Sequence, residues 1–215
     1  MTGALEKGLI VLVADRNMQA AVEGVLLRHK ALDVAAIDFD IERHPERDPG
    51  CRNEGVALLG LFHRRYAHAI LMFDWEGCGA KEQSAEALEQ KLEQDLQALW
   101  GDRARVIIID PELESWVWSD SPHVEDILLW KGRKPGLQAW LREKKFEFAE
   151  SGKPLRPKEA MEAALREARK PLSSSIFQSL AETVGFSCCT DRAFGKLRAT
   201  LAEWFPEQGA HQGDG

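Results

Sequence analysis

The sequence predicts an α/β protein built on a mostly parallel sheet. Residues 8–14, and residues 106–109 within the segment 105–110, are continuous apolar runs rich in β-branched side chains, which is typical of strands buried on both faces. Between these two runs, strand-like segments alternate with segments of helical apolar spacing. This order predicts a parallel-dominated sheet with helices on both faces.

Each element follows from local signals. The first strand stops at Asp15-Arg16-Asn17, an N-cap cluster that predicts a helix over 18–29. A second strand is expected at 33–39, and the polar, turn-rich stretch 41–53 is expected to be a loop. The further elements expected before Asp110 are a helix at 54–66, a strand at 68–73 and a helix at 84–100.

The pattern after Asp110 is helical. A short helix with Pro111 in its first turn is expected to leave the last strand. We therefore expect an α/β domain over 1–122, a C-terminal helical appendage over 123–207 packed on it, and a disordered tail over 208–215. Helices of the appendage are expected at about 124–130, 135–145, 157–169, 173–184 and 191–204.

Composition fits an ordinary soluble globular protein, with 44% hydrophobic and 29% charged residues in a chain of 215. No apolar run is long enough to span a bilayer, and the first residues lack a signal-peptide pattern. The four cysteines have no metal-ligand spacing, and adjacent Cys188 and Cys189 suit a disulfide poorly. Reduced thiols and a cytoplasmic location are the simplest interpretation.

The net charge of −7 hides an asymmetry. Residues 1–126 carry 13 Lys and Arg against 24 Asp and Glu, a balance of −11, whereas residues 127–215 carry 15 against 11, a balance of +4. Such halves suit a site where acids hold a cation and bases hold an anionic substrate. They equally suit two lobes that simply attract each other.

Acidic residues follow three of the predicted strands. Asp15 follows the first, Asp74 and Glu76 end the run 70–76, and Asp110 ends the last, with Glu112 and Glu114 just beyond. Carboxyl ends of parallel strands share one edge of the sheet, where ligands bind. Acids that converge there repel one another unless a proton or cation relieves them, and Mg²⁺ prefers oxygen ligands. The alternative is a set of solvated acids in turns and one N-cap.

Three motifs resemble the Toprim-like domains of bacterial defence and repair nucleases of the OLD and RloB type. They are Val-Leu-Val-Ala-Asp15, Phe-Asp74-Trp-Glu76-Gly and Glu114-Ser-Trp-Val-Trp-Ser-Asp120. Over about 8–206 the chain also resembles a bacterial component of the methylation-associated phage defence system. The segments that carry this resemblance include His44-Pro-Glu-Arg-Asp-Pro-Gly-Cys and Arg156-Pro-Lys-Glu-Ala. The resemblance implies a Toprim/Rossmann-like fold, other defence-system subunits or nucleic acid as partners, and no membrane. It leaves homo-oligomerisation open.

The resemblance also implies roles for individual residues. Mg²⁺ or Mn²⁺ would be held by Asp15, Asp74, Glu76 and Glu114, and catalysis would use Asp74, Glu76, Glu114 and Lys158. Phosphate contacts would come from Arg43, Arg47 and Arg52, because arginine forks match phosphate oxygens. The chain departs from the family pattern, which has Glu then Gly where this chain has Ala14-Asp15. A metal-dependent nuclease and a catalytically degenerate subunit that binds nucleic acid or nucleotide, or acts as a scaffold, both remain open.

Overall fold

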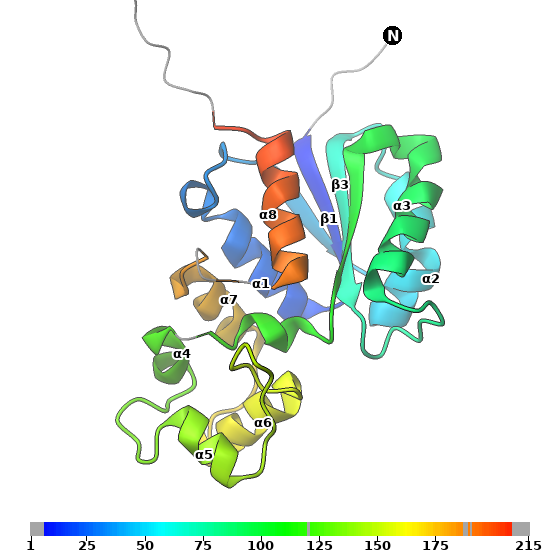
Figure 1. Ribbon diagram of the computed structural model, residues 1–215. Helices are drawn as coiled ribbons and strands as arrows, with labels where there is room; N and C mark the ends of the chain where they lie inside the picture. The colour runs from blue at the N-terminus through cyan, green and yellow to red at the C-terminus, as the bar shows by residue number, and fades with distance from the viewer. Residues whose placement is uncertain (1–6, 120, 187–188, 190, 208–215) are drawn as a thin grey trace, which may run out of the picture.

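In a computed structural model of the protein, the residues described are 7–119, 121–186, 189 and 191–207. Four parallel strands form one sheet in the order β2-β1-β3-β4 (Figure 1). The predicted α/β class with a parallel sheet is confirmed. The strands are β1 (Lys7–Val13), β2 (Phe39–Arg43), β3 (Tyr66–Asp74) and β4 (Ala104–Ile109).

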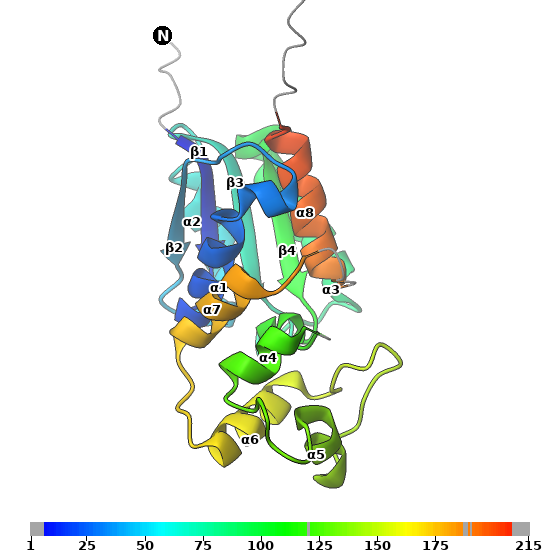
Figure 2. The same cartoon turned by 90° about the vertical axis from the view of Figure 1, so that its left-hand side faces the viewer.

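Helices cover both faces of this sheet. Figure 1 shows α1 (Arg16–Leu26) and α8 (Arg192–Trp204) on one side, with α7 (Ser174–Thr183) packed on α1. The other side carries α2 (Arg47–Gly60) and α3 (Ala85–Trp100). Helices α4 (Pro122–Ile127), α5 (Leu137–Glu143) and α6 (Pro157–Ala168) lie beyond the carboxyl edge, as Figure 2 also shows.

The middle of the sheet forms the core. Residues 9–13 of β1, 69–73 of β3 and 106–109 of β4 are all buried, with at most 1% of each residue exposed. Strands buried on both faces have continuous apolar sequences rather than alternating ones, which explains why the sequence located these three strands to within about two residues. In the described part of the chain, no helix has the length and apolar character needed to cross a membrane.

The expected second strand at 33–39 is wrong. Strand β2 is Phe39–Arg43, six residues later, and residues 35–38 form no regular element. Strand β2 lies at the edge of the sheet and is only partly buried, so its polar sequence gives a weak strand signal. Val34 is buried for a different reason: it forms an isolated antiparallel bridge with Pro206 near the end of the described chain.

The loop expected over 41–53 is also wrong, because α2 begins at Arg47. Pro49 lies within the first helical turn, where proline's missing N–H needs no partner within the helix. Gly50 lies against buried His44: a Cβ at position 50 would be 2.0 Å from Nδ1 of His44. His44 in turn accepts a hydrogen bond from the backbone N–H of Glu46 at 3.1 Å. Residues that resemble a loop in sequence are therefore the start of a packed helix.

We expect Gly50→Ala to destabilise the protein by about 1–3 kcal/mol, because the added methyl group overlaps the His44 ring. Gly195→Ala is the matched control. Gly195 lies exposed in α8 with nothing within 4 Å of its would-be Cβ, so alanine there should stabilise by about 0.5–1 kcal/mol. Chemical denaturation measures both changes. Equal effects of the two substitutions would contradict the close His44–Gly50 contact.

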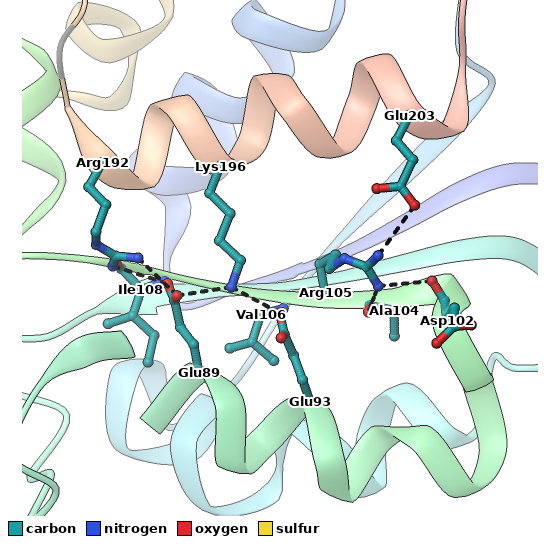
Figure 3. Close-up of polar contacts among 10 residues, drawn as sticks. All are labelled: Glu89, Glu93, Asp102, Ala104, Arg105, Val106, Ile108, Arg192, Lys196 and Glu203. Carbon is teal, nitrogen blue, oxygen red and sulfur yellow. Dashed lines mark hydrogen bonds and ion pairs between the residues drawn. The ribbon is translucent and has the colours of Figure 1, made fainter. Parts of the chain in front are cut away.

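The opposite edge strand, β4, has its outer backbone groups bound by side chains (Figure 3). Glu93 of α3 accepts a hydrogen bond from Val106 N–H at 2.9 Å, and Glu89 accepts one from Ile108 N–H at 2.7 Å. An unpaired strand edge is a template for unwanted pairing with another chain. Acidic side chains of the neighbouring helix thus take the place of a fifth strand.

Two cations of α8 complete this arrangement. Arg192 donates to the carbonyl of Ile108 at 2.8 Å and to both oxygens of Glu89 at 2.9 and 3.1 Å. Lys196 contacts Glu89 and Glu93 at 2.9 Å each. Helices α3 and α8, on opposite faces of the sheet, are therefore joined around the edge of β4 (Figure 3).

Candidate functional site

The site lies where the strand order reverses. Strand β1 is followed in the chain by β2 on one side of it, and β3 is followed by β4 on the other. In open α/β sheets the crevice at such a switch point, outside the carboxyl ends of the strands, is where ligands bind. Asp74 is the last residue of β3, and Asp15 follows β1 directly as the N-cap of α1. The topology thus places two acids at the switch point.

Asp15 has a structural task at this position. One oxygen, Oδ1, accepts hydrogen bonds from the backbone N–H groups of Asn17 and Met18, both at 2.9 Å. This is N-capping of α1, the alternative to a metal-binding role that the sequence left open for Asp15. Capping fixes the direction of the carboxylate and occupies one of its two oxygens.

Asp74 is the most unusual residue of the site. Its Oδ1 is buried and has no hydrogen-bond partner in the described part of the chain. Burial, together with the charges of Asp48, Glu114 and other acids, raises the pKa of Asp74 well above the ordinary value. A buried polar atom without a partner is costly and rare in native proteins. A proton or a cation at this oxygen would relieve the cost.

Asp48 is a site residue that sequence reasoning missed. It lies in the first turn of α2, and its Oδ1 accepts the backbone N–H of Asp74 at 2.9 Å. Burial raises the pKa of Asp48, and the negative charge of Asp15 raises it further. The sequence does carry a signal for Asp48: it is an acid that comes soon after a strand, β2, as Asp15 comes soon after β1. This signal was lost because 41–53 was interpreted as a loop and the strand was placed too early.

Glu112 and Glu114 are brought to the same place by the 3₁₀ helix η3 (Leu113–Trp116) after β4, and each is only 5% exposed. Burial, with the charges of Glu112 and Asp15 adding to it, raises the pKa of Glu114 to about 7. Burial also raises the pKa of Glu112, although nearby Lys158 opposes the rise.

Lys158, in the first turn of α6, is the cation at this edge. Its backbone N–H donates to Oε1 of Glu112 at 3.1 Å, and its Nζ lies 3.6 Å from Oε2 of the same residue. Burial lowers its pKa, but the charges of Glu112, Glu114 and Asp74 raise it more, so the net direction is upward. The lysine predicted to act at this edge is therefore in electrostatic contact with three of its acids.

Most of the other predicted residues are exposed, whereas the acids of this cluster are buried or partly buried. Glu76 is exposed, its backbone N–H donates to the carbonyl of Pro111 at 2.9 Å, and its charge raises the pKa of Glu112. Arg43 and Arg47 are exposed at the end of β2 and the start of α2. The half-buried Arg52 has its Nη2 4.0 Å from Glu82.

Asp110 does not join the cluster. It lines a separate polar cavity of about 360 Å³ with Glu86, Asp191 and Arg192, beside the carboxyl end of β4. Burial and the charge of Glu86 raise its pKa. The acids after the predicted strands are therefore divided between two places, and only some of them converge.

The donor set suits a hard divalent cation. The acids that act on Asp74 are Asp15, Asp48, Glu112 and Glu114, and an unpartnered oxygen lies among them. Within the described residues, however, no three His, Cys, Asp or Glu side chains are already arranged to hold a metal. Mg²⁺ commonly takes only one or two carboxylates, completed by water and substrate phosphate. The residues fit such a shared site rather than a complete protein cage.

Comparisons of the chain with protein-family models, with curated proteins and with solved structures gave no match. The function is therefore argued from the residues of this edge.

Proposed function

We propose that the acidic edge binds Mg²⁺ or Mn²⁺ together with a phosphate of nucleic acid, and that the protein is a metal-dependent phosphodiester-cleaving component of a bacterial phage defence system. The observation that supports this most is the buried, unpartnered Oδ1 of Asp74 among further acids at the switch point. The sequence resemblance to Toprim-like defence proteins points to nucleic acid as the substrate class.

The residues divide the work as follows. Asp74 and Glu114 would hold the cation, Asp48 and Asp15 would accept hydrogen bonds from its water shell, and Lys158 would neutralise the phosphate. A bound divalent ion supplies an activated water and stabilises charge on the leaving oxygen. The arginines at 43, 47 and 52 would contact phosphates of the incoming nucleic acid. Exposed Glu76, whose charge acts on Glu112, would add a carboxylate on the cation's side of the site.

A second function has its own support. Lys158 already places a positive charge among the acids, and Asp15 is engaged as an N-cap. A lysine that serves as the resident cation suits a degenerate Toprim-like subunit that binds nucleic acid or nucleotide, or acts as a scaffold, without cleaving. The two functions differ in whether the protein cleaves nucleic acid when a divalent metal is present.

Calorimetric titration with Mg²⁺ and Mn²⁺ tests the metal site, and a cleavage assay with the same ions separates the two functions. We expect the wild type to bind one of these ions and Asp74→Asn to lose at least about tenfold in affinity, because the substitution removes a charged ligand without changing its size. A cleavage assay on labelled DNA and RNA with each metal should show the same loss.

Asp110→Asn is the matched control, because it removes the same charge from the neighbouring strand end but lines the other cavity. It should bind metal like the wild type. Metal binding without cleavage would favour the non-catalytic subunit. No metal binding, or equal losses in the two variants, would refute the proposed site.

A further inference from the structure

The helices beyond the carboxyl edge carry a surface whose charge is opposite to that of the site. Residues 131–145, here called the basic segment, contain six Lys and Arg and one Glu, a balance of +5 in a chain whose total is −7. The segment runs from the end of α4 through α5. Its six cationic residues are all exposed: Lys131, Arg133, Lys134, Arg142, Lys144 and Lys145.

Few of these charges are neutralised by the protein itself. Lys131 forms an ion pair with Asp126 at 2.9 Å. The other five have no carboxylate partner within ion-pair distance among the described residues. At physiological salt, exposed charges more than about 8 Å apart are largely screened from each other. Asp126, which pairs with Lys131, and Glu125, which accepts the backbone N–H of Leu137, lower the local balance to +3. This positive local balance, rather than the net −7, governs what the surface attracts.

Several of the cations are held against aromatic rings. The guanidinium of Arg142 lies 4.2 Å from the ring centre of Phe148, and the Lys144 ammonium lies 5.5 Å from that of Trp140. Such cation–π contacts orient a charge without neutralising it. Two further cation–π pairs lie in or next to the basic segment. Arg133 lies over Trp130, and Arg156, just outside the segment, lies over Phe146.

The basic segment is also held in a fixed position relative to the acidic edge, the carboxyl edge of the sheet where Asp74 lies among other acids. Helix α5 contacts α6, and α6 contacts η3, which carries Glu114. The first turn of α6 supplies Lys158, which binds Glu112 of the site. Figure 1 shows α5 and α6 together beyond the carboxyl edge of the sheet. A polyanion bound on the basic segment would thus lie on the side of the molecule where the acids converge.

We infer that the basic segment 131–145 binds the phosphate backbone of nucleic acid without sequence preference and presents it to the acidic edge. This inference rests on the proposed function for its substrate class but makes a claim of its own, because backbone binding needs no metal. Contacts of lysine and arginine with phosphates release counterions, so the affinity should fall steeply with salt.

The test is fluorescence anisotropy with labelled single-stranded DNA, duplex DNA and RNA of equal length, in EDTA, at several salt concentrations. Lys134→Ala/Lys145→Ala removes two exposed charges of the basic segment. It should weaken binding at least about tenfold and reduce the slope of log affinity against log salt by about two. Lys30→Ala/Arg64→Ala removes the same charge near the amino edge of the sheet and should leave binding unchanged.

Asp74→Asn, tested in the same EDTA buffer, separates the inference from the proposed function. It should bind nucleic acid at least as well as the wild type in EDTA, whereas calorimetric titration without EDTA should show that it has lost metal binding. No binding by the wild type, equal losses in the two double variants, or tighter binding to anionic phospholipid vesicles than to any oligonucleotide would overturn the inference. The comparison of the three oligonucleotides identifies which nucleic acid is preferred.

Discussion

Replacing Glu89 with alanine is expected to lower the free energy of unfolding by about 3–5 kcal/mol. The Glu89 side chain is only 3% exposed and accepts hydrogen bonds from Arg192, Lys196 and the N–H of Ile108. Removing Glu89 leaves Arg192 with only Glu86, and Lys196 with only Glu93, as carboxylate partners among the described residues. Truncating one partner of a buried ion pair is the costly way to break it. It also leaves the backbone N–H of an edge strand unsatisfied.

Urea denaturation measures this change, with Glu203→Ala as the control. Glu203 also pairs with an arginine beside β4, Arg105 at 3.4 Å, but its side chain is 60% exposed. Exposed pairs contribute about 0–1 kcal/mol, so the control should be almost neutral. Similar small effects for both variants would show that the joined edge in Figure 3 contributes little to stability.

Glu114→Gln is expected to stabilise the metal-free protein at alkaline pH by up to about 4 kcal/mol. The pKa of Glu114 is about 7 in the folded protein, whereas an unfolded glutamate titrates near 4.3, and each pKa unit corresponds to about 1.4 kcal/mol. Between these two pKa values, the folded state binds more protons than the unfolded state. The wild type therefore loses stability as pH rises from about 4.5 to 7, and the full loss persists above pH 7.

Thermal or urea denaturation in EDTA from pH 4.5 to 8.5 tests this expectation. The difference between Glu114→Gln and wild type should be greatest above pH 7 and should shrink toward pH 4.5. Glu143→Gln, at an exposed position of α5, should follow the wild type at every pH. If the advantage of Glu114→Gln were the same at pH 4.5 and pH 8.5, deprotonation of Glu114 would not be its cause.

The sequence predicted best what is buried most. Strands β1, β3 and β4 are covered on both faces of the sheet, so nearly every residue of each is apolar. A continuous apolar run in the sequence therefore identifies each of these strands. Because Asp74 ends such a run, its place at the carboxyl edge also followed from the sequence. Lys158 was singled out as well, and the structure places its ammonium beside Glu112.

What the sequence did not predict depends on tertiary contacts. Strand β2 is a partly buried edge strand, so its polar residues resemble a loop, and the error there concealed Asp48. The start of α2 depends on Gly50 fitting against His44, a contact that no local pattern reveals. Asp110 comes at the end of β4 much as Asp74 comes at the end of β3. Strand β4 is an edge strand of the sheet, however, and Asp110 lines the separate polar cavity with Glu86 and Arg192.

The most direct test of the acidic edge is anomalous diffraction from crystals of the protein soaked in Mn²⁺. We predict an anomalous peak bonded to Oδ1 of Asp74, with a carboxylate oxygen of Glu114 as the next protein ligand, at about 2.1–2.2 Å for each bond. Crystals of Asp74→Asn should lack the peak. Saturating Mn²⁺ that leaves no peak at Asp74 in the wild type, or a peak only at the cavity beside Asp110, would contradict the proposed site.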